Sequence, residues 1–240
     1  MNEISAKVTG STSVLIKTVV GGHSLNEELI AVNWFDTRTE WLYHLYNSLA
    51  SRSVKKIGGL PLFKAKVAKD ISDDKFRRDI ILIVQYPSGN AFKNLIESNY
   101  FKIVSLLRVK AVNRFTFSFT KAVINPKFEK KYAFYAIHNY SSRMAKEVIL
   151  DNIKEVEQGN ISVLYNGYTF AHLSKVIKGQ SPEDIEYIVD NVIVYGGDNE
   201  EQLTQFLNSA SYKAHFGTQQ NEYKGLLNSC LLYTSDAADE

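Results

Sequence analysis

The sequence predicts an α+β protein built from two successive β-α-β-β-α-β units that pack sheet to sheet. Its 240 residues are 45% hydrophobic and 22% charged, so the chain can bury enough apolar surface to offset the entropy lost on folding. That length allows one large domain or two of ordinary size. Apolar runs of strand length alternate with stretches of helical periodicity, and their order in the first half recurs in the second.

The first half begins with an expected strand and an expected helix. Residues 13–20 form an apolar run that ends at Gly21-Gly22, as a strand would. The helix should begin at a capping box formed by Thr37 and Glu40. Its inward stripe is predicted from helical spacing to comprise Trp41, Leu42, Leu45, Tyr46 and Leu49.

Further elements complete the first half. An extended run over 60–69 and a polar turn at 72–74 lead into a strand over 78–86. A helical region opens at 87–90, and residues 114–120 then alternate as a half-buried strand does. The apolar residues of the helical region are Phe92, Leu95, Ile96, Tyr100, Ile103, Val104 and Leu107.

The second half repeats this order after a linker near Pro126. We therefore expect one unit over residues 1–126 and another over 127–229, with Tyr195 matching Tyr86 at the end of the third strand. The expected strands are 132–140, 161–177, 187–195 and 223–227, and the expected helices lie around 144–156, 203–207 and 212–216, with a turn at 179–184.

Residues 230–240 differ in character from the rest of the chain. They resemble the conceptual translation of a transposase-type sequencing adapter, and a natural acidic tail is the alternative. We expect the natural chain to break off near Ser229. Cys230, the only cysteine, would leave with this tail, so no disulfide, thiolate nucleophile or Cys-bound zinc is expected.

The order β-α-β-β-α-β is the ferredoxin-like split motif. Each such unit has helices on one face of its sheet, and two units in one chain can cover each other's second face. The residues that carry a closer resemblance are Gly58-Gly59, Tyr86-Pro87-Ser88, Ala91-Phe92, Tyr100 and Arg108. In this pattern the chain resembles the uncharacterised small-protein branch of the dimeric α+β barrel superfamily, well over 12–122 and more loosely over 130–228.

The resemblance implies a fold and a range of activities. The fold would be an intramolecular dimeric α+β barrel, and relatives include oxygenases that act on activated aromatic substrates, isomerases and haem proteins. The second unit departs from the pattern, because Gly196-Gly197 follows Tyr195 where the first unit has Pro and Ser. An activity tied to that corner is therefore in doubt in the second unit.

Several function classes lack their sequence signals. None of the five histidines has zinc-hydrolase spacing, and no phosphate-binding loop or nucleophile elbow occurs, so neither a metal nor a cofactor is expected. RNA-recognition modules share the order of elements, but residues 80–84 offer no ring on which a base could stack, so no nucleic-acid partner is expected. No apolar run reaches about 18 residues and the start lacks a secretory signal, so we expect a cytoplasmic monomer or homodimer with no membrane partner.

The remaining candidate is a ligand site between the two sheets. His138 is the candidate catalytic residue, because a buried polar group on an apolar strand needs a partner and histidine transfers protons near neutral pH. Tyr100 and Arg108 could hold an anionic or enol-like ligand. The candidate ligand-binding residues are His138, Lys17, Tyr86, Tyr195, Tyr100 and Arg108.

Each of these residues also has a structural interpretation. His138 could reach solvent at a rim or pack in the core, and Tyr100 and Arg108 could belong to a helix surface or the core. We therefore predict a small-molecule-binding protein, with a cofactor-independent monooxygenase- or isomerase-like activity as one possibility. The alternative is a non-catalytic structural or interaction module whose sheets pack dry.

Overall fold

The computed structural model describes residues 26–72, 76–129, 131–141, 160–172, 190–216 and 222–230. The expected strand at 13–20 with Lys17, the helix at 144–156, the turn at 179–184 and residues 231–240 lie outside this part of the chain. Its strands are β1 (Leu29–Thr37), β2 (Leu60–Asp70), β3 (Ile80–Tyr86), β4 (Val112–Ile124), β5 (Phe134–Tyr140), β6 (Ile161–His172), β7 (Asn191–Gly197) and β8 (Tyr223–Ser229). Its helices are α2 (Glu40–Lys56), α3 (Gly89–Glu97), α4 (Asn99–Ala111), α7 (Glu200–Asn208) and α8 (Ala210–Phe216).

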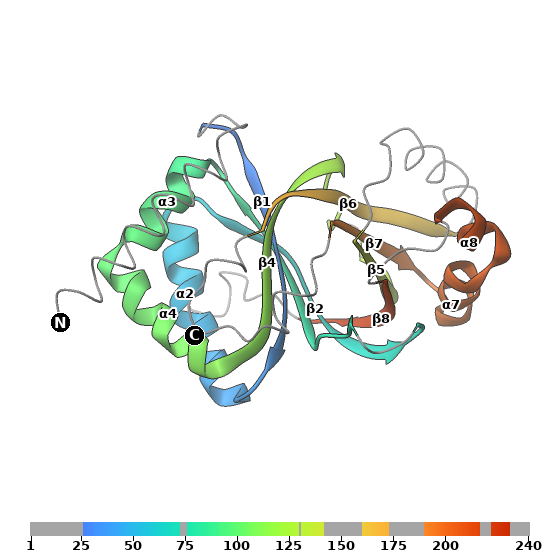
Figure 1. Ribbon diagram of the computed structural model, residues 1–240, viewed down its shortest axis with the longest axis horizontal. Helices are drawn as coiled ribbons and strands as arrows, with labels where there is room; N and C mark the ends of the chain where they lie inside the picture. Colours follow the sequence, from blue (N-terminus) through green and yellow to red (C-terminus); the bar gives the residue numbers. More distant parts are fainter. Residues whose placement is uncertain are drawn as a thin grey trace. The chain divides into compact units, whose positions relative to one another are not determined.

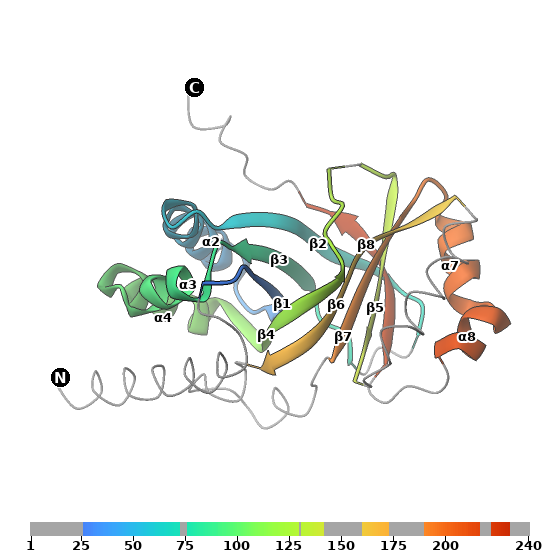
Figure 2. The same cartoon turned by 90° about the horizontal axis from the view of Figure 1, so that it is seen from above.

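The strands form a closed barrel in the order β1-β3-β2-β8-β5-β7-β6-β4 (Figures 1 and 2). This order contains β4-β1-β3-β2 followed by β8-β5-β7-β6, so each half of the chain supplies four neighbouring strands in the arrangement of one ferredoxin-like unit. Strand β1 pairs with β4, β2 with β8, β5 with both β7 and β8, and β6 with β7, all antiparallel. The predicted fold class, two ferredoxin-like units in an α+β barrel, is confirmed.

The residues of the chain also group in space into two compact units. Unit 1 comprises 1–61, 83–120 and 170–186, and unit 2 comprises 62–82, 121–169 and 187–240. Helices α2, α3 and α4 belong to unit 1, and α7 and α8 belong to unit 2. The boundary expected between residues 126 and 127 stays a prediction.

The third strand of each ferredoxin-like half and the two helices after it follow one template, with the same spacing along the sequence. Strands β3 and β7 start at residues 80 and 191, α3 and α7 at 89 and 200, and α4 and α8 at 99 and 210, a constant shift of 111 residues. Tyr86 therefore corresponds to Gly197, and Tyr195 corresponds to Val84. The predicted match of Tyr86 with Tyr195 was wrong by two residues, because β7 continues through Gly196 and Gly197 after its tyrosine.

The helix caps repeat as well. Ser88 and Asn199 accept hydrogen bonds from the backbone N–H groups of Ala91 and Gln202. At the next helix, the Oγ of Ser98 accepts from the N–H of Phe101, and the Oγ of Ser209 from that of Tyr212. These side chains satisfy backbone donors that have no partner inside a helix, so they set where each helix begins.

Two local predictions in the first half were wrong. Strand β1 precedes α2 and was missed, because all its residues but the last are buried and it shows no alternation of polar and apolar side chains. The expected capping box at Thr37 does not form, since Thr37 ends β1 and Thr39 is the N-cap of α2 without a side-chain cap.

The predicted inward stripe of α2 was wrong at Trp41 and Leu45. Tyr43, Ala50 and Val54 are the buried residues of this helix, whereas Trp41 and Leu45 are exposed. Apolar residues occupy both sides of α2, so periodicity alone could not tell which side faces the sheet. The interpretation of the alternating phenylalanines of β4 as core is confirmed: Phe117 and Phe119 pack against Phe92 of α3, with ring centroids 5.9 and 4.9 Å away.

Candidate functional site

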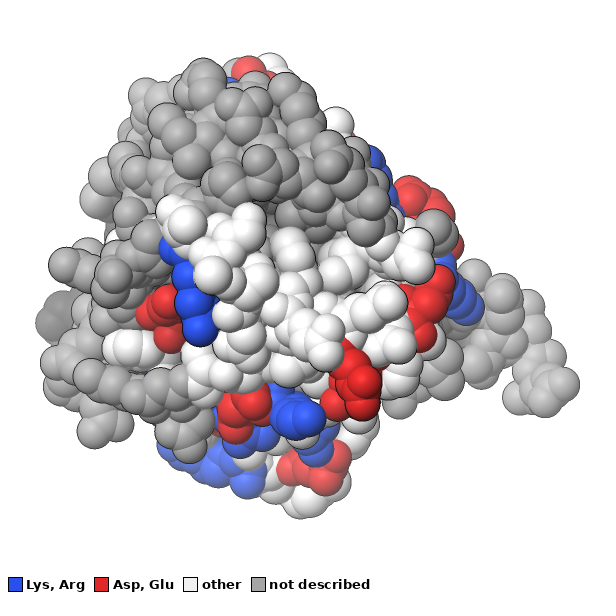
Figure 3. All heavy atoms as spheres, turned by 90° about the vertical axis from the view of Figure 1, so that its right-hand side faces the viewer, with Lys and Arg blue, Asp and Glu red and all other residues white. Residues whose placement is uncertain are grey.

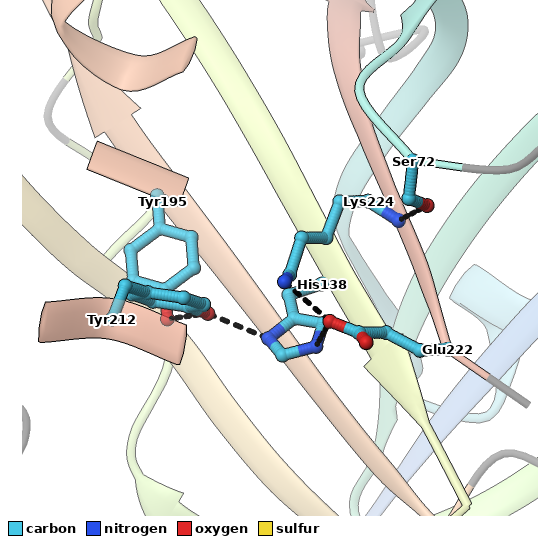
Figure 4. A network of polar contacts seen from close by, with 6 residues as sticks. All are labelled: Ser72, His138, Tyr195, Tyr212, Glu222 and Lys224. Carbon is cyan, nitrogen blue, oxygen red and sulfur yellow. Dashed lines mark hydrogen bonds and ion pairs between the residues drawn. The ribbon is translucent and has the colours of Figure 1, made fainter. Parts of the chain in front are cut away.

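His138 lies at the centre of a network of polar contacts in unit 2 (Figure 4). Its side chain, fully buried on β5, lies beside Tyr212 and Phe216 of α8, with ring centroids 5.5 and 5.1 Å away. His138 therefore faces the helices, and the prediction that it lines the space between two sheets was wrong. Because almost every residue of β5 is buried, the sequence could not show which face of the strand meets the helices.

Two tyrosines continue the network on one side of the imidazole. The Nδ1 atom of His138 lies 2.5 Å from the hydroxyl oxygen of Tyr212. That oxygen lies 2.8 Å from the hydroxyl of Tyr195 on β7. Ser209 helps to place Tyr212, because it caps the first turn of α8.

An acid and a base lie on the other side of the imidazole. The Nε2 atom of His138 is 3.0 Å from Oε1 of Glu222, although the ring N–H does not point straight at that oxygen. Lys224 forms an ion pair with the same carboxylate oxygen. Lys224 lies directly opposite His138 in the β5–β8 register, and its backbone N–H donates to Oγ of Ser72 at 2.8 Å. Glu222 and Lys224 are two residues apart and so extend from the same face of the chain.

Burial decides the charge state of the imidazole. It lowers the pKa of His138 to about 4, with the hydrogen bond to Glu222 opposing this shift and the charge of Lys224 adding to it. Burial alone would raise the pKa of Glu222, but hydrogen bonds from His138 and Lys224 lower it to about 2. At neutral pH the network therefore contains a neutral His138 and an ionised Glu222.

This charge state gives the hydrogen bonds a direction. We assign the proton of neutral His138 to Nε2, because this atom lies beside the carboxylate, and Nδ1 is then an acceptor. In this assignment Tyr212 donates to Nδ1, and Tyr195 donates to the oxygen of Tyr212. Burial raises the pKa of both tyrosines, so both hydroxyls keep their protons. A proton that reaches the oxygen of Tyr195 could thus be passed along two hydroxyls to His138.

Two further buried polar side chains lie near His138. Within the described part of the chain, the hydroxyl of Tyr140 and both amide atoms of Asn166 form no hydrogen bond. Tyr140 is two residues from His138 on the same face of β5, with ring centroids 4.7 Å apart. Ile193 of β7 lies opposite both His138 and Asn166, so these residues form one row across three strands.

The other predicted site residues do not all join this network. Of the six candidates, the structure brings together His138 and Tyr195, and Lys17 lies outside the described residues. Tyr86 is buried in unit 1 against Phe92, with ring centroids 5.0 Å apart.

Tyr100 and Arg108 lie near opposite ends of α4. The guanidinium of Arg108 lies 4.6 Å from the ring centroid of Phe115 in a cation–π contact. Tyr100 is 49% exposed at the other end of α4. Their ligand-binding roles stay predictions.

Sequence reasoning missed three members of the network. The sequence predicts a helix around 212–216 and a strand over 223–227, but it indicates no functional role for Tyr212, Glu222 or Lys224. One signal was available: Glu222 and Lys224 place two charges on the same face of a strand whose following residues are apolar. Such an alternation at the start of a buried strand indicates charges that must find partners.

Charges elsewhere on this side of the molecule form no field of one sign. On the face that carries α7 and α8, acidic and basic side chains are interspersed around an uncharged centre (Figure 3). Within the described ranges no cluster of three or more His, Cys, Asp and Glu side chains could hold a metal ion. A bilayer span needs about 20 apolar residues in a helix, and no helix in the described part of the chain meets that requirement.

Solved structures identify the fold. A "putative monooxygenase" from Fusobacterium nucleatum matches with a TM-score of 0.50 and 13% identity, over 86% of this chain and 94% of that one. The chain has the dimeric α+β barrel fold. Other barrel structures that match are a chlorite dismutase mutant from Candidatus Nitrospira defluvii (TM-score 0.49, 9% identity, 84% and 91% covered) and an anthrone oxidase-like protein (0.48, 11%, 85% and 92%). No family model and no curated protein matches the sequence of this dimeric α+β barrel.

Proposed function

We propose that unit 2 binds a small, uncharged organic molecule beside the His138 network, and that the network accepts a proton from it. The observation that carries this proposal is the directed chain from Tyr195 through Tyr212 to the neutral imidazole of His138. Such a chain supplies a proton acceptor of fixed tautomer, with Glu222 placed to stabilise the imidazolium that would form.

The unpaired polar groups support a bound molecule at this place. A buried donor or acceptor without a partner costs about 1–3 kcal/mol. A molecule that accepts a hydrogen bond from Tyr140 and pairs with the amide of Asn166 would recover that loss.

The molecule should carry no net charge. Burial lowers the pKa of His138 and raises that of Tyr195, so the surroundings disfavour a bound molecule whose charge has no partner. A phenol or an enolisable carbonyl compound is uncharged and still offers a proton. Loss of that proton is a step that isomerisation and cofactor-independent oxygenation share, and the latter would also consume O₂.

A non-catalytic structural module is the second candidate. It is favoured by the complete burial of His138 and by the close packing around it, in which the rings of Tyr212 and Phe216 are stacked 4.4 Å apart. In this case the network would only satisfy its own polar groups.

Native mass spectrometry of the full chain, with equilibrium dialysis against phenol as a probe, separates the two candidates. We expect the wild type to retain a small molecule or to bind phenol. Tyr140→Phe should weaken this binding about tenfold, or 1.4 kcal/mol, because it removes one hydroxyl. The matched control is Tyr86→Phe, the same change at a buried strand tyrosine of unit 1, which should leave binding unchanged. If no small molecule co-purifies with the wild type and phenol does not bind to it, the structural module is favoured.

A further inference from the structure

Helices α2 and α4 of unit 1 lie side by side (Figures 1 and 2), and each exposes large apolar side chains. The backbone N–H groups of Arg38 and Thr39, just before α2, both donate to the carbonyl of Ala111 at the end of α4, which joins the helices at one end. We call these exposed side chains together the α2–α4 face. Its members and their exposed fractions are Trp41 (69%), Leu45 (44%), Tyr100 (49%), Ile103 (67%), Leu106 (65%) and Val109 (45%).

The α2–α4 face is large for a surface that meets only water. At these exposures the six side chains present roughly 700 Å² of mostly apolar surface, whereas the largest patch on a typical monomer is about 300–600 Å². Each partner of a standard protein–protein interface buries about 800 Å². The face therefore nearly supplies one side of such an interface.

The α2–α4 face is not needed for the core of unit 1. Helix α2 already buries Tyr43, Ala50 and Val54, and α4 buries Val104 and Ala111. Both helices are thus packed through their other sides. Replacing an exposed residue of the face should therefore leave folding intact, which makes the face accessible to experiment.

We infer that the α2–α4 face is the contact between two copies of this chain. A two-fold contact uses the same surface twice, and a layer of two helices can pack on its own copy with the ridges of one in the grooves of the other. None of the six residues is charged, so no like charges would be buried when the face meets itself. Trp41 and Tyr100 are of the residue types that contribute most to interface affinity.

The charges on the two helices are mostly basic. Glu40 is their single acidic residue, whereas α2 also carries Arg52, Lys55 and Lys56 and α4 carries Lys102, Arg108 and Lys110. Helices that lie on anionic membranes also carry Lys and Arg beside their apolar side. Membrane binding is therefore the competing outcome that the experiment must detect.

Sedimentation velocity of the full chain over micromolar concentrations tests the inference. We expect a wild-type dimer, and Ile103→Asp should raise the dimer dissociation constant at least about tenfold, because each copy would bury an unpaired carboxylate. Leu60→Asp is the matched control, since Leu60 is 56% exposed but lies on β2, outside the face. It should dimerise like the wild type, and both variants should melt at the wild-type temperature.

Either of two sedimentation results would by itself overturn the inference. One is a wild type that stays monomeric at the highest concentration, and the other is an Ile103→Asp variant that dimerises as tightly as the wild type. Tryptophan emission adds a local readout, because Trp34 is buried and Trp41 is exposed. The wild-type emission should shift to the blue as concentration rises, and that of Ile103→Asp should not. Monomeric wild type that pellets with phosphatidylglycerol vesicles would assign the face to a membrane and also overturn the inference.

Discussion

In unit 1 the position of Tyr212 is occupied by Phe101 and that of Tyr195 by Val84, although the two units share the same strand, caps and helix starts. The polar chain that crosses unit 2 therefore cannot form in the same way in unit 1. The side of the unit 1 sheet that meets α3 is instead filled by rings, with Phe92 packed against Tyr86.

This difference shows that the template does not require hydroxyls at these two positions. Unit 1 carries apolar groups where unit 2 carries the hydroxyls of Tyr195 and Tyr212. Unit 1 nevertheless buries titratable groups of its own, because Tyr46 interacts electrostatically with both Tyr86 and Arg108. The two units therefore place their buried polar groups at different positions of one template.

The largest expected effect is on the imidazole itself. His138→Ala should lower the free energy of unfolding by about 3–4 kcal/mol, because it opens a buried cavity and leaves Tyr212 and Glu222 without their partner. His44→Ala, at an exposed position of α2 in unit 1, should change it by less than about 0.5 kcal/mol. Denaturant midpoints measure both, and a loss below about 1 kcal/mol for His138→Ala would contradict the packing described here.

The pH dependence of stability should also come from unit 2. The pKa of His138 is about 4 in the folded chain and 6.5 when unperturbed, so the unfolded chain binds more protons between these values. The contribution of His138 to the free energy of unfolding should be fully present above pH 6.5. The free energy of unfolding should then fall by about 2–3 kcal/mol as the pH drops to 4. The depressed pKa of Glu222 extends the loss from pH 4.5 toward 2.

Denaturant titrations at several pH values test this sign. His138→Gln should flatten the curve between pH 6.5 and 4, whereas His44→Gln should keep the wild-type slope. If His138→Gln retained the full slope, another group would be responsible.

Exchanging residues between the units gives an intermediate effect. Tyr212→Phe introduces the residue of unit 1 and should cost about 1–2 kcal/mol, because His138 and Tyr195 each lose a hydrogen bond. The reverse change, Phe101→Tyr, should alter stability by no more than about 0.5 kcal/mol, because Phe101 is only partly buried and its added hydroxyl can be hydrated. Equal costs for the two changes would remove the distinction between the units.

The smallest effect concerns what the units share. Ser98→Ala and Ser209→Ala each remove one cap on the first turn of the following helix, so each should cost about 0.5–1 kcal/mol. Thermal melts of the two variants should shift in parallel. A large cost for Ser209 alone would show that this serine also positions Tyr212 in the network.

Elements that a short stretch of sequence identifies were predicted well. The alternating phenylalanines of β4 were recognised from their periodicity, and β2, β3, β5 and β7 from extended or apolar runs of strand length. Strand β1 was missed: it shows no alternation, and Asn33 and Asp36 interrupt its apolar run. Because almost every residue of β5 is buried, His138 was placed on the wrong side of that strand, and the exposure of Trp41 could not be foreseen on a helix that is apolar on two sides.

The sequence by itself determined the order of elements and hence the α+β class, because hydrophobic periodicity and turn residues act over short stretches of chain. Only the tertiary structure decided which faces turn inward and which polar groups meet. His138 is 74 residues from Tyr212, and the strand register alone brings it opposite Lys224. The pKa shifts follow from that assembly, since burial and partners distant in sequence set the charge of His138 and Glu222.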